Sequence, residues 1–220
     1  MMSNRFLERC IAWYTCASCV QKEPTSADVI IPISYCATPQ GLTRATRENF
    51  LHAIRYARLF PRATIAFCNA EYVFEGASHI ESLEKRQILK EASIPDELIM
   101  EATPITNSVE EAYAIRARLT QTNLLPRHIL LITGAMHAPS ARLIWRKVFP
   151  EAKIVIRCIS YRYETQPDHP IIVQRSSMRW FATNIIRHGM LLMLGLRITA
   201  RFHHLVSIPQ SVSGSRPSSG

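Results

Sequence analysis

Residues 128–139 read HILLITGAMHAP, and this stretch decides the fold class of the chain. Its first part, His128–Thr133, is a short apolar run of the kind that forms a strand buried on both faces of a sheet. Gly134 ends the run, and Pro139 opens a segment with apolar residues at helical spacing that extends to Val148. A strand followed directly by a helix indicates a βαβ unit, which requires a second, parallel strand.

The same alternation extends outward along the chain. Apolar runs predict further strands at Val29–Ile33, Thr64–Cys68, Leu98–Glu101 and Ile154–Ile159, and helical patterns at 44–59, 79–92 and 109–120 lie between them. Because proline cannot donate to a ladder, Pro32 predicts either an edge strand or a strand end. The pattern as a whole predicts an α/β, Rossmann-like three-layer domain with a mostly parallel sheet of about five strands, plus N- and C-terminal helices.

The predicted organisation has a core with an extension at each end. Residues 1–26 are expected to form an N-terminal helix and linker, and residues 27–160 the α/β core. Residues 161–206 are expected to form a helical extension that packs on this core. Residues 207–220 are rich in Pro, Ser and Gly, which predicts a disordered tail.

Composition limits the classes of partner. Hydrophobic residues make up 47% of the chain and charged residues 20%, so the body of the chain is a folded protein and not a disordered one. The formal net charge of +9 makes this a basic protein that favours acidic partners: phosphorylated metabolites, nucleic acid or an anionic membrane surface. We find no basic stripe interleaved with aromatic residues and no nucleic-acid-binding motif, which disfavours nucleic acid.

The cysteines and histidines predict neither a disulfide framework nor a metal site. A chain of 220 residues can bury a sufficient core without disulfides, so we interpret the CxxC pair Cys16 and Cys19 as reduced structural thiols. No second pair follows at zinc spacing, and His203 and His204 have no further ligand at a suitable distance along the chain.

The apolar run GMLLMLGL at 189–196 is much shorter than the ~20 residues needed to cross a bilayer. The sequence therefore predicts a cytoplasmic protein. Three interpretations of the run stay open: a helix that covers the sheet, a homodimer face, or a peripheral contact with a membrane surface.

Ligands of open parallel sheets bind outside the carboxyl ends of the strands, so we searched the strand-to-helix loops. Four of these contain clustered polar residues: 34–43, 69–79, 103–108 and 133–139. The chain has neither GxxxxGK[ST] nor GxGxxG, which argues against ordinary dinucleotide binding. Binding of an anion at a bare helix N-terminus stays open.

His137 is the strongest candidate in these loops. It follows the clearest strand and could act as a general acid or base, although a histidine packed against the sheet edge would give the same pattern. Ser78-x-x-Glu81 and Ser108-x-x-Glu111 both fit the capping box, which accounts well for Glu111.

Capping does not account for Glu110, which is one position away from the box. Asn107 could bind a ligand or hold a turn. Arg44 and Arg47 open a helix, where cations oppose the dipole unless an anion lies nearby. Cys36 offers a separate alternative, a thiolate–imidazole pair with His137.

Several of these residues occur in motifs with a fixed order. Glu81 lies within SHIES, Ser93-Ile94-Pro95 leads into a strand that ends at Glu101, NSVEE occupies 107–111, and T-x-x-x-H spans Thr133 to His137. In order and spacing these motifs resemble the YdcF-like family, also named domain of unknown function 218, to which SanA- and ElyC-like proteins belong. Ser34-Tyr35-Cys36 replaces the family's glycine-rich turn, and Ser140 stands where the family has arginine, with Arg142 two positions later.

The resemblance implies a Rossmann-like fold and a protein that binds a small anionic or nucleotide-like metabolite, with S-adenosylmethionine as one ligand. The reaction would be that of a transferase or hydrolase. His137 would exchange a proton, and Glu81 and Glu110 would orient it or the ligand. The expected ligand-binding residues are Asn107, Ser108, Arg44, Arg47, Arg142, Thr133, Cys36 and Asn69. The alternatives are a non-catalytic binding or regulatory protein held to a membrane or partner, and a cysteine-dependent enzyme that uses Cys36.

Overall fold

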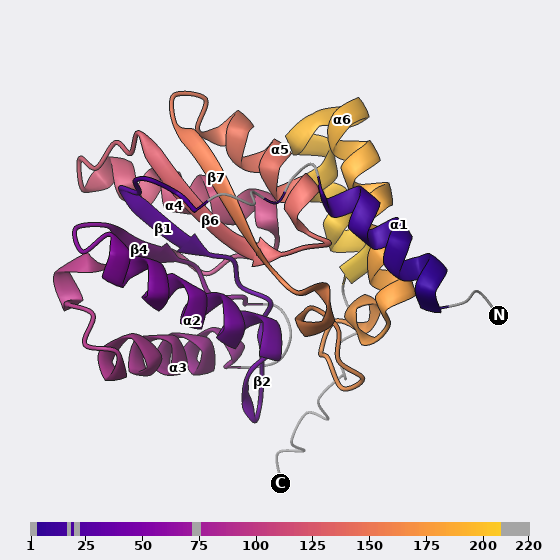
Figure 1. Ribbon diagram of the computed structural model, residues 1–220, viewed down its shortest axis with the longest axis horizontal. Coiled ribbons are helices and arrows are strands. Elements are labelled where there is room, and N and C mark those ends of the chain that lie inside the picture. Colours follow the sequence, from indigo (N-terminus) through magenta and orange to yellow (C-terminus); the bar gives the residue numbers. More distant parts are fainter. Residues whose placement is uncertain (1–3, 17–18, 20–22, 72–75, 208–220) are drawn as a thin grey trace, which may run out of the picture.

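The computed structural model in Figure 1 describes residues 4–16, 19, 23–71 and 76–207. Its helices are α1 Asn4–Cys16, α2 Arg44–Leu59, α3 Ala77–Glu91, α4 Ser108–Gln121, α5 Ala138–Val148 and α6 Ser177–Ser207. Its strands are β1 Val29–Pro32, β2 Ala37–Thr38, β3 Gly41–Leu42, β4 Thr64–Phe67, β5 Ile99–Glu101, β6 His128–Gly134 and β7 Lys153–Ile159. Short 3₁₀ turns occur at η1 Asp96–Leu98, η2 Tyr161–Tyr163 and η3 Ile172–Arg175.

The central sheet has the strand order β5-β4-β1-β6-β7, and every pair in it is parallel. Helix α2 packs against α3, and α4 packs against α5; the two pairs cover opposite faces of the sheet (Figure 1). The predicted α/β class and the sheet of five parallel strands are therefore confirmed, in a Rossmann-like three-layer arrangement.

Strand β1 lies at the centre of this sheet because it is apolar on both faces. Val29, Ile30 and Ile31 are completely buried, and β1 is paired on both sides, with β4 and β6. Pro32 is the last residue of the strand, where a missing N–H donor does least harm. Of the two interpretations of Pro32, the strand end is confirmed and the edge strand is wrong.

The strand order reverses between β1 and β6. The chain leaves β1 toward α2 on one face and leaves β6 toward α5 on the other, so the two loops separate at the carboxyl edge. Such a switch point creates a crevice between the loops. The β2–β3 hairpin extends the loop after β1, and Cys36 opens it with a positive φ of 76°.

The C-terminal extension packs on the core as α6, which contacts α4, α5 and η3. Gly195 has φ 76° and ψ −179°, so the helix is interrupted there. The predicted tail lies outside the described residues beyond Ser207. Within the described part of the chain, no helix has the length and apolar character to span a bilayer.

A disulfide joins Cys19 to Cys158 of β7, with 5.7 Å between their Cα atoms. The prediction that Cys19 is a reduced thiol is therefore wrong. Its partner is 139 residues away in the sequence, so the CxxC spacing carries no information about it. Cys10, Cys36 and Cys68 are free thiols.

Candidate functional site

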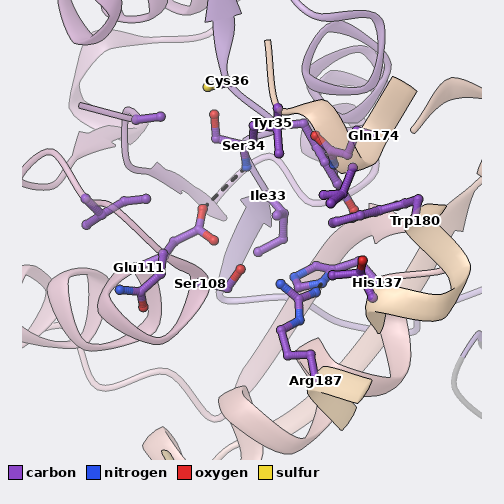
Figure 2. Close-up of a pocket in the computed structure, with 16 residues that line it drawn as sticks. Ile33, Ser34, Tyr35, Cys36, Ser108, Glu111, His137, Gln174, Trp180 and Arg187 are labelled. Atoms are coloured by element: carbon purple, nitrogen blue, oxygen red, sulfur yellow. Dashed lines mark hydrogen bonds between the residues drawn. The ribbon is translucent and has the colours of Figure 1, made fainter. Parts of the chain in front are cut away.

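A small pocket, with about 60 Å³ of accessible space and partly open to solvent, lies at the switch point between β1 and β6. The residues after β1, the start of α4, the loop before α5 and the inner side of α6 line it (Figure 2). The polar residues and aromatic residues that line it are Ser34, Tyr35, Asn107, Ser108, Glu111, His137, Gln174, Trp180, Thr183 and Arg187.

Ser34 is the hub of a polar network at one side of this pocket. Its hydroxyl donates to Glu81 Oε1 at 2.9 Å and accepts from Lys85 Nζ at 3.0 Å. Its backbone N–H donates to Glu111 Oε1 at 3.4 Å, the contact drawn as a dashed line in Figure 2. Ser34 is half-buried, so the network reaches the pocket through this residue.

Glu81 and Lys85 form a completely buried ion pair on α3, with Nζ 3.3 Å from Oε2. The ammonium also donates to the carbonyl of Cys68 at 2.7 Å and to Asn69 Oδ1 at 3.1 Å. Removing one partner of such a pair costs about 3–5 kcal/mol, because the other charge is left buried. Both members of the pair hydrogen-bond to the Ser34 hydroxyl and so hold Ser34 in place. Substitution of either member would therefore be strongly destabilising.

Glu111 is buried beside this pair and lines the pocket. Burial raises the pKa of Glu111 to about 8, and the Glu81 carboxylate adds to that rise; the Ser34 N–H and Lys85 oppose it. At neutral pH the Glu111 carboxyl group is therefore mostly protonated. A neutral carboxylic acid in a pocket can donate a proton or a hydrogen bond to a ligand.

The start of α4 explains why Glu111, and not Glu110, faces the pocket. Asn107 is the N-cap, and its Oδ1 accepts from the N–H groups of Val109 and Glu110, each at 3.0 Å. Glu110 turns back and accepts from Thr106 N at 2.8 Å. The capping interpretation of Ser108 and Glu111 is wrong, because the helix begins one residue earlier than the S-x-x-E spacing requires.

The capping interpretation of Ser78 and Glu81 is wrong for a similar reason. Gly76 is the N-cap of α3, with φ 82° and no side-chain cap, so Ser78 already lies inside the helix. The Ser78 hydroxyl donates to the carbonyl of Ala70 at 2.8 Å. The Glu81 carboxylate is therefore available to Ser34 and Lys85.

His137 is buried at the other side of the pocket, at the N-cap position of α5. Its Nδ1 contacts Nη2 of Arg187, a residue of α6 that also lines the pocket (Figure 2). A guanidinium group carries only donors, so the histidine ring takes the role of acceptor in this contact. Arg187 also donates to Asn184 Oδ1 at 2.7 Å and lies 5.7 Å from the Trp180 ring centroid.

The sequence analysis did not identify Arg187. A usable signal was present, since Trp180, Asn184 and Arg187 recur at helical spacing in a segment that is otherwise largely apolar. All three are buried, and Trp180 and Arg187 line the pocket.

Glu164 was also not identified. It is completely buried and accepts from Met136 N at 2.8 Å, His137 N at 3.2 Å and Trp180 Nε1 at 3.1 Å. Burial raises the pKa of Glu164 to about 7. A Cβ atom at residue 134 would lie 1.9 Å from the Glu164 Cδ atom, so only glycine fits there. Glu164 thus already occupies the Met136 and His137 N–H groups that precede α5.

The remaining predicted residues divide into two groups. Thr133 and Asn69 support the site indirectly. Thr133 Oγ1 is 3.0 Å from Oη of Tyr35, and the side chain of Asn69 accepts a hydrogen bond from Lys85. Cys36 lines the pocket, but burial raises the pKa of its thiol, which is the opposite of what a thiolate nucleophile requires.

The three arginines expected to hold an anion are not among the residues described as lining the pocket. The Arg44 guanidinium lies 4.4 Å from the Tyr163 ring centroid, and Arg47 pairs with Glu84 at 3.0 Å. Arg142 lines a separate hollow together with Glu23 and His128. Arg187 is the arginine that the fold brings to the pocket.

The described residues contain no group of three or more His, Cys, Asp or Glu side chains arranged to hold a metal ion. Fold and pocket together define a Rossmann-like α/β protein with a polar, partly charged pocket at the switch point of its sheet. No family model and no curated protein matches the chain. Membership of the YdcF-like family therefore stays a prediction.

Proposed function

We propose that the protein binds a small anionic or nucleotide-like metabolite in the switch-point pocket, as its resemblance to the YdcF-like family implies. The observation that carries the proposal is the division of the pocket into two sides. Arg187 and His137 lie on one side and Glu111 on the other, with Ser34 and Ser108 between them (Figure 2).

The side formed by Arg187 suits an anionic group. A buried guanidinium attracts a carboxylate or phosphate more strongly than an exposed one, because the surroundings screen its charge less. The His137 ring lies on the same side of the pocket as Arg187. Tyr35 and Trp180, whose ring centroids are 6.5 Å apart, add aromatic surface for a base-like ring.

The opposite side suits proton transfer. Glu111 holds a proton at neutral pH, and the adjacent Glu81 carboxylate is compensated by Lys85. A buried carboxyl group that keeps its proton at neutral pH is a recurrent feature of acid–base chemistry. In a transferase or hydrolase reaction, Glu111 would therefore donate the proton, a role that the sequence assigned to His137 with support from Glu110. Cys36 is the weaker candidate for this chemistry because burial disfavours its thiolate.

Mass spectrometry of the denatured protein would identify a ligand that co-purifies with it, without assuming a substrate. Calorimetric titration with adenosine monophosphate, S-adenosylmethionine and inorganic phosphate follows as a defined set of probes. We expect Arg187→Gln to weaken binding of the anionic probes by roughly tenfold to 100-fold.

Arg47→Gln is the matched control, because Arg47 is an arginine on α2 outside the pocket and should leave affinity unchanged. Equal affinity of Arg187→Gln and the unaltered protein would contradict the assignment. A cytoplasmic location also stays a proposal: structural disulfides are uncommon in reducing compartments, so fractionation should be combined with a test of the Cys19–Cys158 bond.

A further inference from the structure

Helix α6 differs from an ordinary surface helix, because it buries polar residues and exposes a row of large apolar ones. Trp180, Asn184, Arg187 and Leu191 recur at helical spacing and are buried against the core. The side facing away from the core is apolar: Ile186 is 60% exposed, Leu192 62% and Met193 77%. A helix in contact with water would place such side chains inward.

Exposed apolar side chains are concentrated on α6 and its neighbour α1. Of the 14 large hydrophobic residues that are exposed in the described part of the chain, eight belong to these two helices: Phe6, Trp13, Met178, Ile185, Ile186, Leu192, Met193 and Leu194. The helices lie together at one end of the molecule (Figure 1), where Tyr14 Oη donates to the carbonyl of Asn184 at 3.1 Å. A concentration of this kind marks an interaction surface.

The charge of α6 and α1 indicates which kind of partner their exposed apolar surface binds. No Asp or Glu occurs after Asp168, whereas α6 carries Arg179 seven residues before Ile186, which places the two on the same side of the helix. The side chain of Arg179 is exposed, and α1 adds the exposed Arg5 and Arg9. The acidic residue of α1, Glu8, pairs with Arg162 at 3.0 Å. Among the residues whose side chains the structure describes, the apolar face is thus accompanied by the exposed cations Arg179, Arg5 and Arg9.

We propose that the outer face of α6, formed by Ile185, Ile186, Leu192 and Met193, rests on the surface of an anionic lipid bilayer. Apolar side chains would enter the boundary between headgroups and acyl chains while arginines meet the lipid phosphates. A second copy of the chain fits this face less well, because two acid-free basic helices would repel each other. The contact is at the surface because the opposite side of α6, with Trp180, Arg187 and Leu191, stays buried against the core, so that only the outer side can meet lipid.

Cosedimentation of the full chain with vesicles tests the proposal. One set of vesicles contains phosphatidylcholine alone, and the other contains phosphatidylcholine with about one-third phosphatidylglycerol. We expect the protein to sediment with the anionic vesicles and to be released in part by high salt, because salt screens the arginine–phosphate attraction. If the protein stays in the supernatant with both sets, or binds both equally at all salt concentrations, the proposal is wrong.

Substitutions then locate the surface. Combining Ile186→Ser, Leu192→Ser and Met193→Ser should lower the partition coefficient by roughly 100-fold or more, because buried apolar area is lost. The matched control combines Leu51→Ser, Leu83→Ser and Leu125→Ser, which alter comparably exposed apolar residues away from α6. Equal loss of binding in both variants would overturn the assignment to α6. Light scattering that shows a dimer in the unaltered protein and a monomer in the α6 variant would assign the face to a second copy instead.

Discussion

Glu111 illustrates how position, and not residue type, sets the chemistry of a side chain. The carboxyl group is surrounded by the core, Ser34 and the Glu81–Lys85 pair, and burial dominates the balance. Glu110, the next residue, has the same chemistry and instead holds the turn at Thr106. The spacing of motifs could therefore indicate the right helix end, but it could not decide which of two adjacent glutamates faces the pocket.

The pKa of Glu111 predicts a pH dependence of stability. Because the pKa rises from an ordinary value of 4.5 to about 8, the folded protein keeps a proton that the unfolded chain has lost. If Glu111 is considered alone, the free energy of unfolding should be highest below about pH 4.5. It should then fall by up to ~1.4 kcal/mol per pH unit as pH rises toward the folded pKa. Glu164 acts in the same direction up to about pH 7.

Glu111→Gln removes this titration and keeps a similar shape. We expect the variant to be more stable than the unaltered protein at pH 8, by on the order of 3 kcal/mol, and to approach it near pH 5. Urea unfolding at a series of pH values measures the difference. Glu91→Gln, at an exposed position on α3, is the control and should leave the pH profile unchanged. Parallel profiles for Glu111→Gln and the unaltered protein would show that Glu111 titrates normally.

At the level of secondary-structure elements, the residue at which each helix begins determines which side chains face the pocket. Sequence patterns located the helices after β5 and β6 to within a few residues, because apolar periodicity extends over whole elements. The first residue of α4 depended on a local competition between Asn107 and Ser108 for the N-cap. Both types cap well, so the sequence alone did not distinguish them.

Alanine substitutions at these two positions test the register. Asn107→Ala should destabilise the protein by about 1 kcal/mol, because two N–H groups lose their acceptor. Ser108→Ala should change stability by less than about 0.5 kcal/mol, since Ser108 lies inside the helix. Thermal unfolding of both variants provides the comparison. A larger loss of stability for Ser108→Ala than for Asn107→Ala would show that Ser108 is the N-cap. Glu111 would then face away from the pocket.

The disulfide between Cys19 and Cys158 acts on the whole molecule, because it closes a loop that contains nearly all of the core. It joins the segment after α1 to the edge strand β7, and α1 in turn contacts α6 through Tyr14. Both terminal parts of the chain are thus fastened to the same end of the domain. The inner face of α6 is held over the pocket by its packing on α4, α5 and η3.

Removal of this bond should lower stability by about 2–5 kcal/mol, since the unfolded chain gains freedom when a long loop is opened. Cys158→Ser is the variant, and its unfolding free energy is compared under oxidising conditions. Cys10→Ser, which removes a free thiol, should have little effect. The unaltered protein treated with a reductant should match Cys158→Ser. Alkylation of Cys19 and Cys158 in the denatured, unreduced protein would show instead that the bond does not form.

The sequence by itself determined the α/β class, the parallel sheet and the loops in which the pocket lies, because these depend on periodic patterns of apolar residues and on a general rule for parallel sheets. It also predicted His137 and Asn107, which line the pocket, and Glu81, which contacts the pocket residue Ser34. Only the tertiary structure decided which charged groups meet there. Arg187 and Glu164 come from the chain beyond the last strand, and the partner of Cys19 is 139 residues away. Such contacts depend on how distant elements pack: the helical spacing of Trp180, Asn184 and Arg187 indicates a shared face, but not which residues that face meets.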